Sequence, residues 1–202
     1  MKLYSYIVRH DTGFAPNPFW GCCTLANCKP SIRRTASQGD WIVGLSRKSD
    51  GNRIVYTMKV DEIVDYAMYF RDGRFVAKRP DYRQPEVVHR CGDNIYEPLL
   101  GGGFKQLRST HSRGVDEDPA TKDHDLKGRH VLIGRKYVYF GGDGPELPPD
   151  LEVLKVRRGH KCRFPPVVVD SFTGFISQFK EGVLGRPANW PEHDYSWRQR
   201  KS

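Results

Sequence analysis

Long apolar runs are absent from this sequence of 202 residues. Because a membrane-spanning helix needs about 18 or more consecutive apolar residues, we expect none. The opening stretch MKLYSYIVRH interrupts its short apolar run with Tyr4, Ser5, Tyr6 and Arg9, so it lacks the apolar core of a signal peptide. These absences predict a protein that stays in the cytoplasm and has no membrane partner.

Cysteine is also scarce, and its five residues are an odd number that cannot all pair with one another. Cys22 and Cys23 are adjacent, which fits reduced thiols in a cytosol better than a disulfide framework. A C-x2-C pair is missing, and adjacent side chains point apart in an extended segment. We therefore favour buried thiols over a structural zinc ion held by Cys22, Cys23, Cys28 or Cys91.

Several catalytic signatures are missing as well. The sequence has no G-x-S-x-G, no G-x-x-x-x-G-K-[ST] and no H-E-x-x-H, which argues against the common serine hydrolases, P-loop enzymes and zinc proteases. The glycines at 101–103 lack a following Lys-Ser/Thr pair and predict a flexible loop. A run of acids could bind a hard cation together with Asp93, but such runs are more often solvated, so we expect no metal and no cofactor. These acids are Asp116, Glu117, Asp118, Asp123 and Asp125.

Acidic residues are outnumbered, with 24 Asp and Glu against 33 Lys and Arg and a formal net charge of +9. A charge of this sign attracts polyanions before any specific contact forms. Nucleic acid is therefore the leading candidate partner, although some small proteins are basic without binding it. The charge says nothing about the oligomeric state.

The pattern of apolar residues and turn formers predicts an α+β protein. Residues 2–8 alternate as a strand, with Leu3, Ser5 and Ile7 on one face. Pro30 starts a short helix that ends before Gly39. The other predicted elements are strands at 40–46 and 53–60 joined by a turn at Asp50-Gly51, strands at 129–134 and 136–142 joined as a hairpin, and a helix at 168–179.

These elements predict one domain over residues 1–202, built on a small, strongly bent mixed sheet or open barrel with flanking helices. Between about residues 72 and 127 the pattern dissolves into glycine, proline, charge and short apolar pieces. An irregular stretch of this length inside a domain is usually functional. We therefore expect the functional site in this insertion.

Aromatic and amide side chains dominate the candidate site. Asp93 and Asn94 offer the acceptor and donor groups that read the edge of an unstacked base. Aromatic rings could stack on that base, each such stack being worth about 1–3 kcal/mol, although some of the rings must belong to the core. The candidate rings are Phe14, Phe19, Trp20, Trp41, Tyr96, Tyr137, Tyr139 and Phe140.

Six segments resemble the family called nucleotide modification associated domain 2. They are NPFWGCCTLANCKPSIRRTASQGDWIVG (17–44), CGDNIY (91–96), HS (111–112), HDL (124–126), YVYFGG (137–142) and GRP (185–187). The order of strand, helix, GDWIVG strand and hairpin is more distantly similar to the EVE, ASCH and PUA-like superfamily. That second resemblance implies a small pseudo-barrel that binds RNA or modified bases in a pocket.

The family resemblance also implies the roles of particular residues. Lys29 and Arg33, on one face of the predicted helix, would contact phosphate. Phe19, Trp41 or Tyr96 would stack on a base whose edge Asp93 and Asn94 read. The predicted ligand-binding set is Asn17, Pro18, Phe19, Thr24, Trp41, Asp93, Asn94, Tyr96 and His111.

Two functions follow from the sequence. The first is a binding module that recognises a modified nucleotide, with DNA preferred over RNA, in an aromatic and amide pocket with a basic rim. The second is an enzyme acting on modified nucleotides or DNA as a nuclease, glycosylase or base-modifying enzyme. In the enzyme, His111, His124 and Asp93 would be the catalytic groups.

Overall fold

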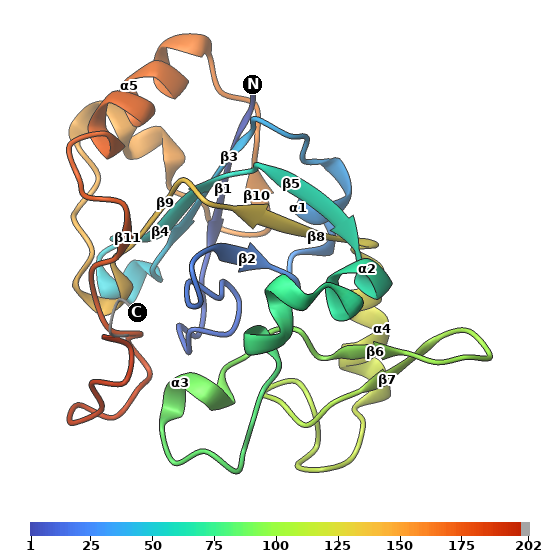
Figure 1. Cartoon of the computed structure of the whole chain (residues 1–202). Helices are drawn as coiled ribbons and strands as arrows, with labels where there is room; N and C mark the ends of the chain where they lie inside the picture. The colour runs from blue at the N-terminus through green and yellow to red at the C-terminus, as the bar shows by residue number, and fades with distance from the viewer. Residues whose placement is uncertain (199–202) are drawn as a thin grey trace.

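The computed structural model describes residues 1–198, and their fold is built on three β-sheets (Figure 1). The largest sheet has the strand order β10-β1-β3-β4-β9-β11, with β1 parallel to β3 and β11 parallel to β9. The six strands are β1 (Leu3–Ile7), β3 (Trp41–Leu45), β4 (Ile54–Lys59), β9 (Tyr137–Tyr139), β10 (His160–Lys161) and β11 (Gly182–Val183). The sheet is therefore mixed, as expected.

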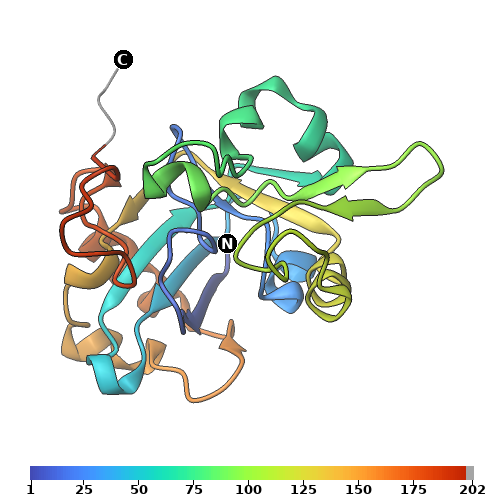
Figure 2. The ribbon, with the colours of Figure 1, turned by 90° about the horizontal axis from the view of Figure 1, so that it is seen from below.

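The two smaller sheets lie beside it. One has the order β2-β8-β5, with β2 (Cys23–Leu25), β5 (Glu62–Asp65) and β8 (His130–Gly134). The other is the hairpin of β6 (Tyr96–Pro98) and β7 (Phe104–Gln106), which projects from the body of the molecule (Figures 1 and 2). The fold is thus α+β with mixed sheets, as predicted, and the sheets do not form a closed barrel.

The helices are short. They are α1 (Pro30–Thr35), α2 (Tyr66–Arg71), α3 (Val87–Arg90), α4 (Pro119–Leu126) and α5 (Pro166–Ile176), with 3-10 turns at Lys48–Asp50, Gly73–Lys78, Gly141–Asp143 and Pro149–Leu154. The helix predicted from Pro30 and the amphipathic helix predicted at 168–179 are both confirmed. No helix of the described residues is long and apolar enough to cross a membrane.

Alternation along β1 assigns its side chains to two cores. Leu3 points to the side covered by α5, where Phe172 and Ile176 pack. Tyr4 and Tyr6 point the other way, between the six-stranded sheet and the three-stranded sheet. Figure 1 shows α5 on one side of the large sheet and β2, β8 and β5 on the other. This arrangement confirms the predicted alternation, because successive strand residues face opposite sides.

A third core fills the far side of the three-stranded sheet. Val131 and Ile133 of β8 pack there with Tyr66 and Tyr69 of α2 and with Ile95. Figure 2 shows α1 and α4 side by side at one end of this layer, where the two helices are in contact. The chain before α1 and the segment around α4 therefore meet.

Two predictions about the chain path were wrong. Strands at 129–134 and 136–142 do not form a hairpin, since β8 pairs with β2 and β5 whereas β9 pairs with β4 and β11. The chain crosses from one sheet to the other between them. The stretch 72–127 is also less irregular than expected, because it contains α3, the β6–β7 hairpin and α4. Asp118 caps α4 by accepting hydrogen bonds from the backbone N–H groups of Ala120 and Thr121.

Candidate functional site

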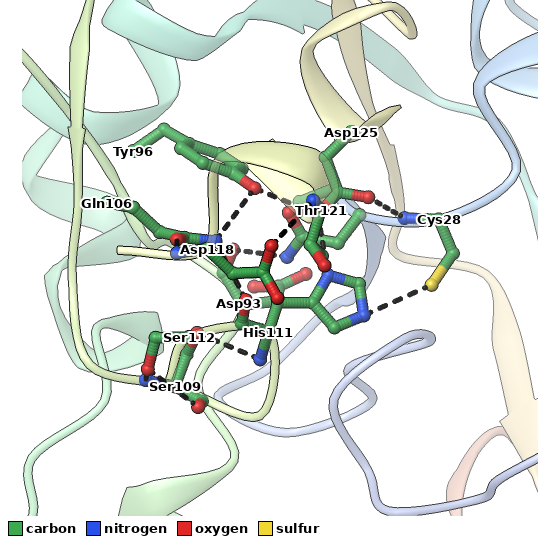
Figure 3. A network of polar contacts seen from close by, with 12 residues as sticks. Cys28, Asp93, Tyr96, Gln106, Ser109, His111, Ser112, Asp118, Thr121 and Asp125 are labelled. Carbon is green, nitrogen blue, oxygen red and sulfur yellow. Dashed lines mark hydrogen bonds and ion pairs between the residues drawn. The ribbon is translucent and has the colours of Figure 1, made fainter. Parts of the chain in front are cut away.

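Three side chains from distant parts of the sequence meet in a chain of hydrogen bonds (Figure 3). The Sγ of Cys28 lies 3.5 Å from Nε2 of His111. Nδ1 of the same imidazole lies 2.6 Å from Oδ2 of Asp125. Cys28 precedes α1, His111 lies between β7 and α4, and Asp125 belongs to the last turn of α4. A thiol, an imidazole and a carboxylate thus stand in the order of a nucleophile, a base and an orienting acid.

The carboxylate of Asp125 is fully buried and engaged on both oxygens. Its Oδ1 accepts the backbone N–H of Cys28 at 2.7 Å. Its Oδ2 accepts the hydroxyl of Tyr96 at 2.9 Å as well as the His111 contact. Asp125 therefore fixes the imidazole and the main chain of the thiol residue at the same time.

Arg33 supports this carboxylate residue from the inside. Its guanidinium donates to the carbonyl oxygens of Asp125 at 2.6 Å, Cys28 at 2.7 Å and His130 at 2.9 Å, and to the hydroxyl of Tyr66 at 2.5 Å. Gly128 allows the close approach, since a Cβ there would lie 2.2 Å from the guanidinium. Arg33 thus ties α1, α4 and β8 together at the site.

The loop that carries His111 is held at several points. The Nε2 of Gln106 donates to the carbonyl oxygen of His111 at 3.1 Å, and the Oγ of Ser109 accepts the His111 N–H at 3.2 Å. The ring of Phe14 lies against the imidazole, with ring centroids 4.7 Å apart. The position of the imidazole is therefore set by contacts on its ring and on its backbone.

The electrostatics keep His111 protonated at neutral pH. Burial lowers the pKa of His111, but the hydrogen bonds and negative charges of Asp125 and Cys28 outweigh it and raise this pKa from 6.5 to about 10. An imidazolium beside a sulfur atom is the arrangement in which cysteine nucleophiles act as thiolates.

Cys28 differs from most of the other cysteines. Cys22, Cys23 and Cys91 are buried, and burial raises the pKa of each of these thiols. Cys28 is half-buried, as is Cys162. The φ of Cys28 is +58°, followed by +42° at Lys29, a left-handed conformation that residues other than glycine seldom adopt. Such uncommon backbone at a partly exposed thiol is frequent in functional sites.

The same three residues are the group that could hold a metal ion. Their ligand atoms all lie within 4.8 Å of one another. Asp125, however, binds the imidazole nitrogen that faces away from the thiol. An ion between Sγ and Nε2 would therefore have two protein ligands, fewer than the three that a catalytic zinc ion usually has. The donor set fits a hydrogen-bonded relay better than a metal centre.

Four of the predicted ligand-binding residues belong to a separate, buried network. Asp93 accepts hydrogen bonds from Thr24 Oγ1 at 2.6 Å and from the Tyr69 hydroxyl at 2.7 Å. Asn94 donates to the carbonyl oxygens of Tyr69 and Phe75. The side chains of Asn17, Thr24, Asp93 and Asn94 are all 0–1% exposed. In this conformation their polar atoms bind the protein itself, so their contact with a base stays a prediction.

Lys78 is the charged centre of that network. Its Nζ donates to Oδ1 of Asn17 at 2.8 Å and to three main-chain carbonyl oxygens, those of Asn17, Phe19 and Cys22. Burial raises the pKa of Asp93, and the charge of Lys78 opposes that rise. The network stabilises the loop at 13–22 through buried, satisfied polar groups.

The predicted stacking residues are also enclosed. Phe19 packs against Tyr139 and Trp190 in one cluster, and Trp41 packs against Phe172 in another. The carbonyl oxygen of buried Pro18 accepts the Tyr137 hydroxyl at 2.9 Å. Tyr96, whose ring is 1% exposed, reaches the site through its hydroxyl on Asp125.

The two residues predicted to bind phosphate differ in their surroundings. Arg33 is enclosed among carbonyl oxygens, as described above, and a phosphate contact would require that cluster to open. Lys29 is half-buried beside Cys28. Of the two predicted histidines, His111 is in the site whereas His124 is exposed on α4.

Sequence reasoning missed the arrangement around Cys28 and much of its support. Cys28 was considered as a zinc ligand, and Asp125 as one acid of a solvated run. Gln106 was not singled out. Chain spacing gave no signal for them, because Cys28 lies 97 residues before Asp125. The Asp118-Pro119 dipeptide, at the start of α4, is a local signal that could have indicated this helix.

Comparison with known proteins gives one result. No curated protein matches the chain, and no solved structure does. The sequence profile described as nucleotide modification associated domain 2 matches residues 1–194, so the chain belongs to this family.

Proposed function

We propose that this protein is an enzyme of nucleotide modification that uses Cys28 as a nucleophile. The observation that supports this proposal is the relay of Cys28, His111 and Asp125, with contacts of 3.5 and 2.6 Å. The family name suggests a role in nucleotide modification. The relay supplies the kind of chemistry that such a role needs.

The arrangement suits transfer of an acyl or amide-linked group. The Cys28 sulfur would attack the carbonyl carbon, forming a carbon–sulfur bond. As the bond from that carbon to the leaving group breaks, Nε2 of His111 would give the leaving group a proton. Water would then attack the thioester carbon and lose its proton to the same nitrogen. The carbon–sulfur bond would break, releasing the acyl group as a carboxylic acid and restoring the starting state of Cys28 and His111. Asp125 would orient the imidazole throughout.

The substrate in this proposal is a nucleotide, carried by DNA in preference to RNA. The formal net charge of +9 supports a polyanionic partner, because electrostatic attraction raises affinity for any nucleic acid. The predicted salt dependence follows: binding should weaken steeply as salt is added.

The test is an activity assay with a matched pair of variants. Modified and unmodified DNA and free nucleotides are incubated with the wild type, Cys28→Ser and Cys162→Ser, and the nucleosides are analysed by mass spectrometry. We expect an altered nucleoside with the wild type and with Cys162→Ser, and a loss of at least about 100-fold with Cys28→Ser. Equal activity of Cys28→Ser and the wild type would overturn the proposal.

A binding module is the second candidate, favoured by the basic charge and by the distant likeness to EVE and PUA-like domains. In that case oligonucleotides with the modified base would bind more tightly than unmodified ones, and Cys28→Ser would bind them equally well. Asp93→Ala and Tyr96→Ala would weaken that preference. A preference for the modified base together with unaltered nucleosides would favour the module over the enzyme.

A further inference from the structure

Lys29 carries a positive charge that no acidic side chain neutralises in residues 1–198. None of the ion pairs there includes it. Its Nζ lies instead 4.8 Å from the centroid of the Tyr6 ring. Burial lowers the pKa of Lys29, and the charge of Arg9 adds to this effect while Cys28 opposes it. The ammonium group is thus partly removed from water without a paired carboxylate.

Two more basic side chains interact electrostatically with Lys29. His160 on β10 stands directly opposite Tyr6 on β1, and its ring centroid is 6.0 Å from that of Tyr4. Burial, and then the charge of Lys29, lower the pKa of His160. Arg9 is exposed just after β1. Neither His160 nor Arg9 takes part in an ion pair within the described chain.

This basic group adjoins the thiol of the relay. Cys28 and Lys29 are consecutive, and their two positive φ angles direct the chain away from the helical path that starts at Pro30. Cys28 also influences Tyr6, the ring beneath the Lys29 ammonium: burial raises the pKa of Tyr6, and the charge of Cys28 adds to the rise. The sulfur and the basic group therefore share one neighbourhood.

A partly buried cation without a partner is unfavourable, because its lost hydration is not repaid. A bound anion would compensate for the lost hydration of this cation. Phosphate is the anion that every nucleotide carries, and lysine and arginine side chains are its usual ligands. The position beside a nucleophile suggests that the anion belongs to the molecule on which the nucleophile acts.

We propose that Lys29 and His160 form an anion subsite beside Cys28 that takes a phosphate group of the substrate nucleotide. This inference rests on the proposed function, which it extends by naming the group that positions the substrate. The phosphate could belong to a free nucleotide or to a nucleic-acid backbone. The phosphate group would be recognised through the same negative charge and oxygen atoms from either source.

Alkylation of Cys28 tests the subsite without knowledge of the substrate. Iodoacetate is an anion and iodoacetamide is neutral, and both alkylate a thiol at the same kind of carbon. The ratio of their rates at Cys28, followed by peptide mass spectrometry, measures attraction of the anion separately from the reactivity of the sulfur. We expect Lys29→Gln to lower this ratio at least about 5-fold and Lys29→Arg to keep it, because only a cationic side chain attracts the iodoacetate anion.

Lys180→Gln is the matched control. Lys180 is exposed and follows α5, which packs on the opposite face of the six-stranded sheet from α1. The ratio should stay unchanged in this variant. An unchanged ratio in both Lys29→Gln and His160→Gln, with circular dichroism spectra like that of the wild type, would overturn the subsite.

Protection experiments distinguish the sources of the phosphate. Inorganic phosphate, a deoxynucleoside monophosphate and a single-stranded oligonucleotide are each added before iodoacetamide. Protection by the monophosphate but not by the oligonucleotide indicates a free nucleotide. Protection by the oligonucleotide but not by the monophosphate indicates nucleic acid. Protection by neither contradicts the subsite.

Phosphate binding can also be measured by calorimetry, comparing wild type with Lys29→Gln. If Cys28→Ser keeps nucleotide-modifying activity while Lys29→Gln loses phosphate binding, the assignment of Cys28 as nucleophile is wrong and the anion subsite is supported. If Cys28→Ser is inactive while Lys29→Gln binds phosphate as the wild type does, the assignment of Cys28 as nucleophile is supported and the anion subsite is wrong.

Discussion

The guanidinium of Arg33 donates to the main-chain oxygen of Asp125, while the carboxylate of the same aspartate binds His111 and the backbone of Cys28. Arg33, which the sequence predicts to contact phosphate, therefore holds the backbone of the candidate site in place. This relationship gives the site a rigid base, since the arginine is bound to three segments of the chain.

Arg33→Lys should destabilise the protein by about 2–4 kcal/mol, because lysine leaves several buried carbonyl oxygens without a donor. Urea unfolding followed by circular dichroism measures the change. Arg34→Lys is the control, as Arg34 is exposed and makes one bond of 3.2 Å to Lys127; we expect a change within about 0.5 kcal/mol there. Similar losses of unfolding free energy in Arg33→Lys and Arg34→Lys would contradict the structural role of Arg33.

Cys28 should react with iodoacetamide at pH 6.5 faster than the half-buried Cys162. His111→Ala should slow the reaction of Cys28 at least about 10-fold, because the imidazole nitrogen 3.5 Å from the sulfur is gone. The rate at Cys162 in the same sample is the internal control. Reaction of Cys28 at the same rate with and without the imidazole would mean that the two groups are not coupled.

The stability of the fold should depend on pH through His111. Its folded pKa of about 10 lies above the unfolded value of 6.5, so protonation favours the folded state. The contribution is complete below pH 6.5 and is lost as the pH rises through 10. The difference in unfolding free energy between wild type and His111→Ala should therefore shrink from pH 6.5 to pH 10.5. A difference that stays constant or grows would show that this titration is not linked to folding.

Lys78→Met should cost about 3–5 kcal/mol, since it removes a buried charge that four oxygen atoms and the nearby Asp93 compensate. The midpoint of urea unfolding gives the change. Lys127→Met, at an exposed position, should leave the midpoint nearly unchanged. If Lys78→Met lowers the free energy of unfolding by less than about 1 kcal/mol, the buried network around Lys78 does not stabilise the fold as proposed.

The sequence allowed the regular parts of the fold to be predicted, because their signals are local. Alternation in β1, the proline before α1 and the apolar spacing of α5 each depend on neighbours within one turn or strand. Sheet membership of β8 and β9 could not be predicted in this way, since it depends on which distant strands pair with them.

The candidate site was predicted in part for the same reason. His111 was singled out, and the insertion that holds it was named as the place of the site. Arg33 shares a predicted helical face with Lys29, but two of the three carbonyl oxygens that it binds belong to residues 92 and 97 positions away. Buried aspartates and arginines look like surface residues in a sequence, because their partners are distant.

The distance along the chain between the thiol and its partners has a consequence for the newly made protein. Cys28 is synthesised 97 residues before Asp125, and domains tend to form from the N-terminus as the ribosome proceeds. Until α4 has emerged and docked beside α1, the sulfur has neither imidazole nor carboxylate next to it. The full set of contacts around Cys28 can therefore form only after residue 125 has left the ribosome.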